Sequence, residues 1–258
     1  MLTGDFVAWI LLVIGAATLI SLVVFKRPPP FGKHADAMND IALMRRVLEY
    51  RINARVAWAV WEAPCLVWML YGLAIHGVPQ SWHAQLLCVM FGGHYMNRSV
   101  IYPLRLKSPR RVPLGIALCA MAFCVANGFV QYFAIFESTH SLPSTSLILL
   151  GLVLFVVGMT INLHADAHLR SLRQDGSKGY KIPRAGMFRY CSSAHYTGEI
   201  LQWTGYALAS GLRLHAVSFA VFTACNLIPR ALETHRWYQQ KFGRDYPSNR
   251  TAVLPFVL

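Results

Sequence analysis

The sequence predicts an all-α integral membrane protein with seven transmembrane helices, its N-terminus outside and its C-terminus in the cytoplasm. The first observation is composition: the 258 residues are 55% hydrophobic and 14% charged, with a mean hydropathy of +0.41, whereas soluble domains carry about a quarter charged residues. The second is a series of apolar runs that reach or approach the roughly 20 residues of a spanning helix. The third is a one-sided distribution of basic residues.

Seven apolar segments account for most of the chain, and polar or Pro-rich connections separate them. We expect helices at residues 6–25, 56–76, 82–104, 113–136, 145–165, 194–212 and 215–232. The Pro-rich connection 26–55 is expected to contain a surface helix around 39–54. Because no internal repeat or low-complexity segment is evident, we expect residues 1–258 to form a single domain.

Lys and Arg residues set the orientation of these spans. Four connecting or terminal regions hold 23 of the 24 basic residues, and with seven spans all four lie on the same side. Arg213 falls on the opposite side, whose other loops at 77–81 and 137–144 have no Lys or Arg. The positive-inside rule places the basic side in the cytoplasm. A six- or eight-span arrangement would split the basic residues between the two sides.

The net charge of +13 is compatible with nucleic-acid binding, yet basic residues at membrane ends more often set topology or meet anionic lipid. We therefore expect membrane lipid as a partner and no nucleic acid. The six cysteines lie mostly within apolar runs and lack CxxC spacing, so no structural disulfide and no metal site is expected. The first apolar run is too long for a cleavable signal peptide.

Polar residues gather at the ends of the later spans. Asn162 and Asp166 are four residues apart and therefore share a helix face. His195, Glu199 and Trp203 repeat this spacing. A carboxylate, an imidazole and an indole on one face suit a ligand that is both polar and planar. The alternatives are polar groups that mark a helix end, and an internal salt bridge to a nearby arginine.

The last expected span ends in a similar row. Arg230, Thr234 and Tyr238 share a face, with His235 beside them, and arginine can clamp phosphate oxygens with two hydrogen bonds. Anchoring in lipid headgroups is the alternative for the arginine and aromatic residues here. The chain has no GxGxxG, Walker A, GxSxG or HExxH motif, so the soluble dinucleotide-binding and hydrolase signatures are absent.

Glu62 is the most informative single residue, because it lies within an otherwise apolar run. A buried carboxyl group tends to stay protonated or to find a hydrogen-bond partner, and Tyr95 in the next expected span is a candidate. A Glu–Tyr pair in an apolar pocket could present a proton to a substrate carbonyl and lower the barrier to adding electrons to its conjugated system. A purely structural hydrogen bond between helices is the alternative.

Several stretches of the last third form a specific pattern. They are Gly158-Met-Thr-Ile-Asn-Leu-His-Ala-Asp, Leu169-Arg-Ser-Leu-Arg, Tyr180-Lys-Ile-Pro-Arg-Ala-Gly-Met-Phe, Tyr196-Thr-Gly-Glu-Ile-Leu-Gln-Trp-Thr-Gly-Tyr-Ala-Leu-Ala, Asp245-Tyr-Pro-Ser-Asn-Arg and Leu254-Pro-Phe. Weaker matches upstream are Phe31-Gly-Lys-His, Trp58 with Glu62 and Pro64, and His94-Tyr-Met-Asn-Arg. The pattern resembles the steroid 5α-reductase family over nearly all of the chain.

This resemblance implies a seven-span enzyme that uses NADPH to reduce the Δ4 double bond of a 3-oxo steroid. It implies a substrate pocket mainly from residues 1–110 and an NADPH site mainly from 158–258. Glu62 and Tyr95 would hold and polarise the 3-oxo group, with Trp58 also in the substrate site, while hydride reaches C5 and a proton reaches C4. The implied NADPH contacts are Arg98, Arg105, Asn162, Asp166, Arg173, Tyr180, Lys181, His195, Glu199, Trp203, Arg230, His235 and Tyr238.

The sequence departs from the family pattern at Trp61, His195 and Thr234, which affects the nicotinamide contacts and the substrate's shape rather than the reaction class. Three alternatives stay open. They are a membrane methyltransferase of the isoprenylcysteine or phospholipid type, a reductase of another sterol or enone lipid, and a non-catalytic sterol-binding protein. We expect a monomer in the bacterial inner membrane or, in a eukaryote, in the endoplasmic reticulum.

Overall fold

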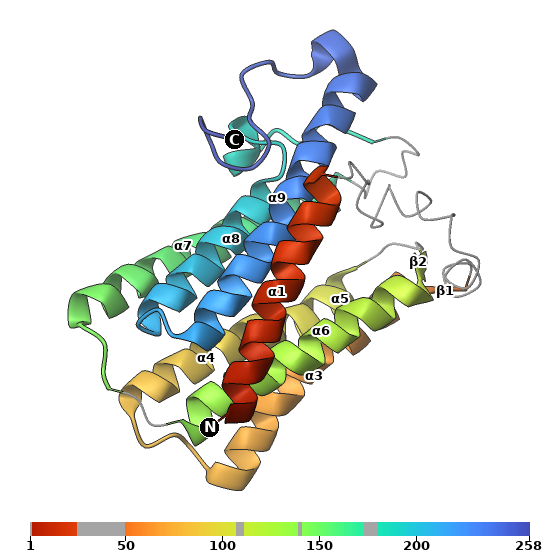
Figure 1. The fold of residues 1–258 in the computed structure, drawn as a ribbon. Coiled ribbons are helices and arrows are strands. Elements are labelled where there is room, and N and C mark those ends of the chain that lie inside the picture. The colour runs from red at the N-terminus through yellow and green to blue at the C-terminus, as the bar shows by residue number, and fades with distance from the viewer. Residues whose placement is uncertain (1, 25–49, 107–110, 139–140, 173–179) are drawn as a thin grey trace. The chain divides into compact units, whose positions relative to one another are not determined.

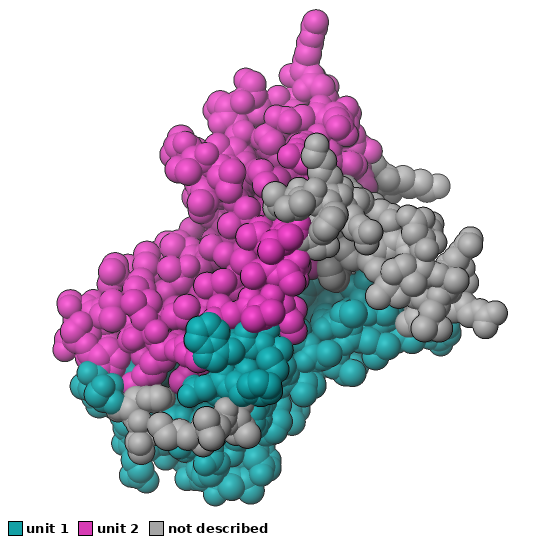
Figure 2. Space-filling view, viewed as in Figure 1, with its two compact units in different colours: residues 1–11, 28–142 teal, residues 12–27, 143–258 magenta. Residues whose placement is uncertain are grey.

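The computed structural model describes residues 2–24, 50–106, 111–138, 141–172 and 180–258 (Figure 1). The chain forms two compact units, shown in different colours in Figure 2. Unit 1 contains residues 1–11 and 28–142, and unit 2 contains residues 12–27 and 143–258. The expectation of a single domain stays a prediction. Arg173, one of the expected cofactor contacts, lies outside the described residues.

Unit 1 is built mainly of helices, with one small sheet. Its elements are the first part of α1 (Leu2–Val24), β1 (Arg51–Asn53), α3 (Ala54–His76), α4 (Trp82–Met96), the π-helix η2 (Asn97–Ile101), α5 (Tyr102–Arg105), β2 (Arg111–Pro113), α6 (Leu114–Tyr132) and the π-helix η3 (Phe133–Glu137). β1 and β2 pair antiparallel, with Ile52 opposite Val112. Residues 51–53, the end of the surface helix expected around 39–54, therefore form a strand. Residues 25–49, which hold the rest of that expected helix, lie outside the described part.

Helices α3 and α6 pack closely at Gly128. A Cβ atom on Gly128 would lie 2.9 Å from the Cα of Cys65 and 3.1 Å from the carbonyl oxygen of Pro64. Both neighbours belong to the α3 backbone, so only glycine allows this approach. Pro64 lies inside α3 and has no N–H to donate to the preceding turn. The close approach brings the polar face of α6 beside Glu62, which precedes Pro64 by two residues.

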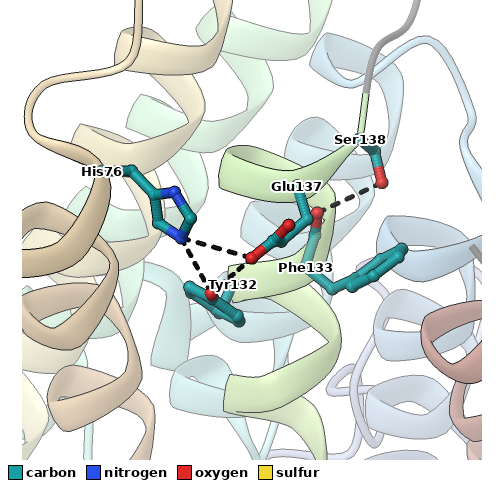
Figure 3. Close-up of polar contacts among 5 residues, drawn as sticks. All are labelled: His76, Tyr132, Phe133, Glu137 and Ser138. Carbon is teal, nitrogen blue, oxygen red and sulfur yellow. Dashed lines mark hydrogen bonds and ion pairs between the residues drawn. The ribbon is translucent and has the colours of Figure 1, made fainter.

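The C-terminal ends of α3 and α6 are joined by a polar cluster (Figure 3). The hydroxyl of Tyr132 donates to Glu137 at 2.8 Å and lies 2.9 Å from Nε2 of His76. Nε2 of His76 also lies 3.2 Å from the same carboxylate oxygen. Ser138 closes the π-turn by donating to the carbonyl of Phe133 at 3.1 Å. The cluster thus connects the last residue of α3 to the end of η3.

We expect Tyr132→Phe to lower the free energy of unfolding by about 1–2 kcal/mol, because it leaves Glu137 and His76 without this hydroxyl but keeps the ring. Thermal unfolding of purified protein in detergent would measure the loss. Tyr71→Phe is the matched control: Tyr71 is 47% exposed, and its hydroxyl has no hydrogen bond among the described residues. Equal effects of the two substitutions would contradict a stabilising role of the cluster.

Unit 2 is a helical bundle with a folded C-terminal tail. Its elements after α1 are α7 (Thr145–Ser171), the 3₁₀-helix η4 (Gly186–Arg189), α8 (Ala194–Ala209), α9 (Leu214–Phe242) and the 3₁₀-helix η5 (Gly243–Asp245). α7, α8 and α9 lie side by side (Figure 1). Val253 and Ala252 of the tail are buried against Ala231 of α9. The tail is therefore part of the packed unit.

Each of the seven apolar segments expected to be helical is largely helical where the structure describes it, although residues 210–212 form a turn and Pro113 ends strand β2. Three helices of the described part, at Ala54–His76, Leu114–Glu137 and Thr145–Ser171, are long and apolar enough to cross a membrane. A shorter apolar helical stretch covers Gly4–Ile20. The helical fold class is confirmed at this level, while the seven spans and the orientation of the termini stay predictions.

Candidate active site

In unit 2, polar residues expected from the sequence come together on three neighbouring helices. Asp166 of α7, Glu199 of α8 and Arg230 of α9 all lie close enough to the phenol of Tyr196 to interact with it electrostatically. Arg230 also interacts with Glu199. Tyr196, which was not among the expected site residues, thus lies at the centre of this group. The available signal was its place at the start of the Tyr196-Thr-Gly-Glu stretch that carries the family resemblance.

Asn162 ties α7 to the start of α8. Its Nδ2 donates to the backbone carbonyl of His195 at 2.9 Å, and the side chain is 2% exposed. Phe188 of η4 packs against the ring of His195 at 6.3 Å between centroids. The amide of Asn162 therefore fixes the first turn of α8, from which His195 and Glu199 extend.

Trp203, Tyr180, Lys181 and Tyr238 have different surroundings. Trp203 is 1% exposed, and its ring centroid lies 4.2 Å from that of Phe219, so it forms part of the apolar interior. Tyr180 packs edge-on against Trp237 at 4.8 Å between centroids, and Lys181 beside it is exposed. Tyr238 is buried in an aromatic stack near the tail. Their expected role as cofactor contacts stays a prediction.

His235 belongs to a hydrogen-bonded network that holds the tail. Its Nδ1 lies 2.5 Å from the hydroxyl of Ser192, and that hydroxyl lies 2.6 Å from the hydroxyl of Tyr246. Ser192 also donates to the carbonyl of Thr251 at 3.0 Å, and Nε2 of His235 meets Gln239 at 2.8 Å. Both ring nitrogens of His235 are thus engaged within the chain. The network was not predicted from the sequence, because Ser192 is 43 residues from His235 and 54 residues from Tyr246.

Acidification should weaken this network. Burial lowers the pKa of His235 below its ordinary value of 6.5. When the pH is lowered through about 6.5, the unfolded chain takes up a proton at this residue more readily than the folded chain does. The free energy of unfolding therefore decreases as the pH is lowered. Between pH 7.5 and 5.5 we expect wild-type protein to lose more thermal stability than His235→Asn, whose amide does not titrate. All other residues are the same in both proteins, so identical pH slopes would contradict the prediction.

In unit 1, Glu62 and Tyr95 lie in one cluster with two thiols. Trp61 Nε1 donates to one carboxyl oxygen of Glu62 at 3.1 Å, and the Cys124 thiol lies 3.8 Å from the other. Tyr95 is 3% exposed and interacts electrostatically with Glu62, Cys124 and Cys65. Glu62 and Tyr95, the two residues expected to form a carbonyl-activating pair, thus both meet α6, Glu62 through Cys124 and Tyr95 through Asn127. The contacts of Glu62 with Trp61 and Cys124 were not predicted from the sequence.

Tyr95 also receives a hydrogen bond from α6. Asn127 Nδ2 donates to the phenolic oxygen at 3.4 Å, and Gln131 Nε2 donates to Asn127 Oδ1 at 3.4 Å. These two amides were missed as site residues. Their four-residue spacing within an apolar run was a usable signal, of the same kind as that of Asn162 and Asp166.

Arg98 is held against aromatic rings in unit 1. Its guanidinium carbon lies 5.0 Å from the Trp58 ring centroid and 5.3 Å from that of Tyr102, distances typical of cation–π contacts. Arg98 is 8% exposed and lies on the π-helix η2, a type of distortion common at functional sites. Arg105 at the end of α5 is exposed. Arg98 is thus fixed next to Trp58, the third residue expected in the substrate site.

The charged side chains of unit 2 fit a dinucleotide. Carboxylates such as Asp166 and Glu199 can accept hydrogen bonds from ribose hydroxyls, and Arg230 can bind phosphate oxygens. The exposed Lys181 adds positive charge to the same unit. Among the residues that the structure describes, no group of three or more His, Cys, Asp or Glu side chains could hold a metal ion.

Comparison with known proteins identifies the family. A family model described as 3-oxo-5-alpha-steroid 4-dehydrogenase matches residues 110–258. Human 3-oxo-5-alpha-steroid 4-dehydrogenase 1 is 40% identical, with 88% of this chain and 85% of the human protein covered. The Bos taurus protein of the same name is 38% identical, with 89% and 88% covered. Steroid 5-alpha-reductase DET2 of Solanum lycopersicum is 37% identical, with 98% and 96% covered. These matches confirm the resemblance seen in the sequence: the chain belongs to the 3-oxo-5-alpha-steroid 4-dehydrogenase family of oxidoreductases.

Proposed function

We propose that this protein is a multi-pass membrane enzyme that uses NADPH to reduce the Δ4 double bond of a 3-oxo steroid to the 5α-reduced product. Its relatives are named for steroid 5-alpha reduction. The observation that carries the proposal within this chain is that Glu62 and Tyr95 of unit 1 both contact helix α6, through Cys124 and Asn127 respectively. Neither a methyltransferase nor a sterol-binding protein requires a proton-donating pair of this kind.

The reaction consumes a conjugated enone, so the carbonyl oxygen gains negative charge as electrons are added at C5. A hydrogen bond from the Tyr95 hydroxyl to the 3-oxo group, with Glu62 beside it, stabilises that charge more strongly in the transition state than in the substrate. The C4=C5 π bond breaks, a C5–H bond forms and a proton from solvent completes C4. Bound NADPH would supply the hydride.

On the cofactor side, we propose that Asp166, Glu199 and Arg230 bind the ribose and phosphate groups, with Asn162 holding the first turn of α8 in place. The role of Arg98 as a cofactor contact stays a prediction. The sequence-based roles of the other expected contacts, which are Arg105, Arg173, Tyr180, Lys181, His195, Trp203, His235 and Tyr238, stay predictions.

The decisive experiment incubates purified protein with NADPH and testosterone or progesterone, and identifies the product by mass spectrometry and chromatography against 5α and 5β standards. We expect the 5α-reduced steroid and equimolar NADP⁺. A parallel incubation supplies S-adenosylmethionine and membrane lipid. Methyl transfer without steroid reduction would replace the proposal with the methyltransferase alternative, and reduction of other enone lipids only would change the substrate class.

A further inference from the structure

The C-terminal tail of unit 2 carries an exposed apolar tip. Phe256 and Val257 are 83% and 79% exposed, the two highest values for large apolar side chains in the part of the chain that the structure describes. Leu254 and Leu258 beside them are also exposed. Exposed apolar residues on a spanning helix face lipid, but these four lie beyond η5, the last helical element of the described chain. A contiguous apolar patch of this kind marks a site of interaction.

Residues 254–258 form a closed turn, which we call the tail turn. The backbone N–H groups of Val253 and Leu254 donate to the carbonyl of Leu258 at 2.7 and 2.8 Å. Those of Val257 and Leu258 donate to the carbonyl of Leu254 at 3.1 and 3.0 Å. These hydrogen bonds fix the backbone, so an ordered turn presents the exposed apolar side chains.

Phe256 adopts a strained backbone conformation in the tail turn. Its φ is +64°, in the left-handed region that glycine enters freely and a bulky residue rarely does. Backbone strain of this kind clusters at sites that contact a ligand. Glycine would satisfy the turn at a lower cost, and the Phe256 ring is too exposed to contribute much to packing within the chain. An aromatic residue at this position is therefore best explained by a partner outside the chain.

The tail turn folds back beside η4 (Figure 1), where the rings of Phe256 and Tyr190 lie 5.6 Å apart between centroids. η4 ends with the exposed Arg189, and its Phe188 lies in one buried cluster with Ala165 in the polar C-terminal part of α7. α7 is one of the described helices that are long and apolar enough to cross a membrane. The tail turn thus lies near the end of a candidate span, where aromatic and arginine side chains are favoured at the level of the lipid headgroups.

We propose that the tail turn, together with Tyr190 and Arg189, is a docking surface for an anionic lipid bilayer, with the Phe256 and Val257 side chains inserted among the headgroups. Apolar contact and attraction between basic residues and anionic lipid are the two components of interfacial membrane binding. Phe256 and Val257 supply the first component, and Arg189 supplies the second. The net charge of +13 favours an anionic surface over a neutral one. The surface is separate from the residues assigned to the reaction, so its test does not depend on the proposed function.

The test places the full-length protein in lipid nanodiscs and measures the depth of the tail turn. Phe256→Trp adds an indole to the seven native tryptophans, and subtraction of the wild-type spectrum isolates its emission. In nanodiscs of phosphatidylcholine and phosphatidylglycerol, lipid brominated near the headgroup end of its acyl chains should quench most of this emission. Ser248→Trp is the matched control, because Ser248 is exposed in the polar part of the tail. Its emission should be quenched by iodide in the water and not by brominated lipid.

A titration with phosphatidylglycerol measures the electrostatic component. Quenching at position 256 should rise with the fraction of this anionic lipid. Arg189→Gln should lower the docking constant about fivefold, the change expected for one basic residue near an anionic surface. Arg244→Gln is the matched control, because Arg244 is exposed but lines a surface pocket with Ser248, and it should leave the docking constant unchanged.

Phe256→Gly separates docking from folding. Because glycine relieves the strain at this position, the variant should unfold in detergent at the same temperature as wild-type protein or at a higher one. In anionic nanodiscs it should unfold at a lower temperature than wild type, because the inserted ring is lost. A lower unfolding temperature already in detergent would show that Phe256 serves the fold, and would overturn the proposal.

Val257→Trp is the second fluorescent probe if Phe256→Trp does not fold. Equal quenching by brominated lipid at positions 256 and 248 would show general proximity to lipid rather than a docking surface. A blue-shifted emission without quenching would show that protein, such as a second copy of the chain, covers the ring. Either result overturns the proposal, as would quenching at position 256 that is equally strong without phosphatidylglycerol.

Discussion

Tyr95→Phe is expected to lower kcat for a Δ4-3-oxo steroid by about 10²–10³-fold, the range typical of losing one donor to a developing oxyanion. The substitution removes only the hydroxyl, and the ring stays packed at 4.6 Å between centroids from Phe91. Steady-state kinetics would measure kcat, and fluorescence titration would measure the Kd for NADPH. We expect that Kd to remain unchanged, because Tyr95 acts on the steroid carbonyl.

Glu62→Gln tests the other member of the pair. The amide has the same shape as the carboxyl group, but one of its two oxygens becomes an NH₂ group that would face either Trp61 Nε1 or the Cys124 thiol. We expect a similarly large fall in kcat with NADPH binding retained. Tyr71→Phe, which removes an exposed hydroxyl from the same helix as Glu62, is the control and should keep full turnover. Normal steroid reduction by both site variants would disprove carbonyl activation by this pair.

The helical fold was predictable because hydrophobic composition and helix length are strongly linked in membrane segments. All seven helices were found, but their ends were less certain. α9 was expected to end near residue 232 and instead continues to Phe242. Its last turns are polar and gave no apolar signal. They are stabilised by the contact of His235 with Ser192, which precedes α8, and by the stack of Tyr238 on Tyr246 of the tail at 5.4 Å between centroids.

Short elements were missed for a related reason. β1 and β2 have three residues each, too few to produce an alternating pattern. Their pairing joins residues far apart in the chain, such as Ile52 and Val112, so no local pattern predicts it. The π-helices η2 and η3 have five residues each and were not predicted either. Pro103, which follows η2, lacks an N–H group to donate to the preceding turn.

The candidate site could be predicted where a charged residue stands out from an apolar run. This was the case for Glu62, Asp166, Glu199 and Arg230. Neutral polar residues such as Asn127, Gln131 and Tyr196 were missed, because an amide or phenol in a membrane helix is common and its importance depends on a partner distant in sequence. Asn127, for example, is 32 residues from Tyr95.

The register of α7 and α8 rests on four glycines, and substituting one should have the largest effect on stability. Gly151 and Gly158 of α7 face Gly205 and Gly198 of α8, seven residues apart on each helix. A Cβ atom on Gly158 would lie 2.6 Å from the carbonyl oxygen of Gly198 and would also clash with the backbone nitrogen of Gln202. Because backbone atoms cannot move aside as a flexible side chain can, the helices would have to separate.

Gly158→Ala is therefore expected to lower the free energy of unfolding by about 3 kcal/mol, the upper end of the usual overpacking range. Thermal unfolding in detergent would show it. It should also weaken NADPH binding, because Asn162 lies one turn away and reaches His195 only at this helix spacing. Gly92→Ala in α4 is the matched control, since its Cβ would meet nothing within 4 Å, and alanine should stabilise that helix by about 0.5–1 kcal/mol. If both variants unfolded at the same temperature, close backbone contact between α7 and α8 would not be what holds Asp166 and Glu199 together.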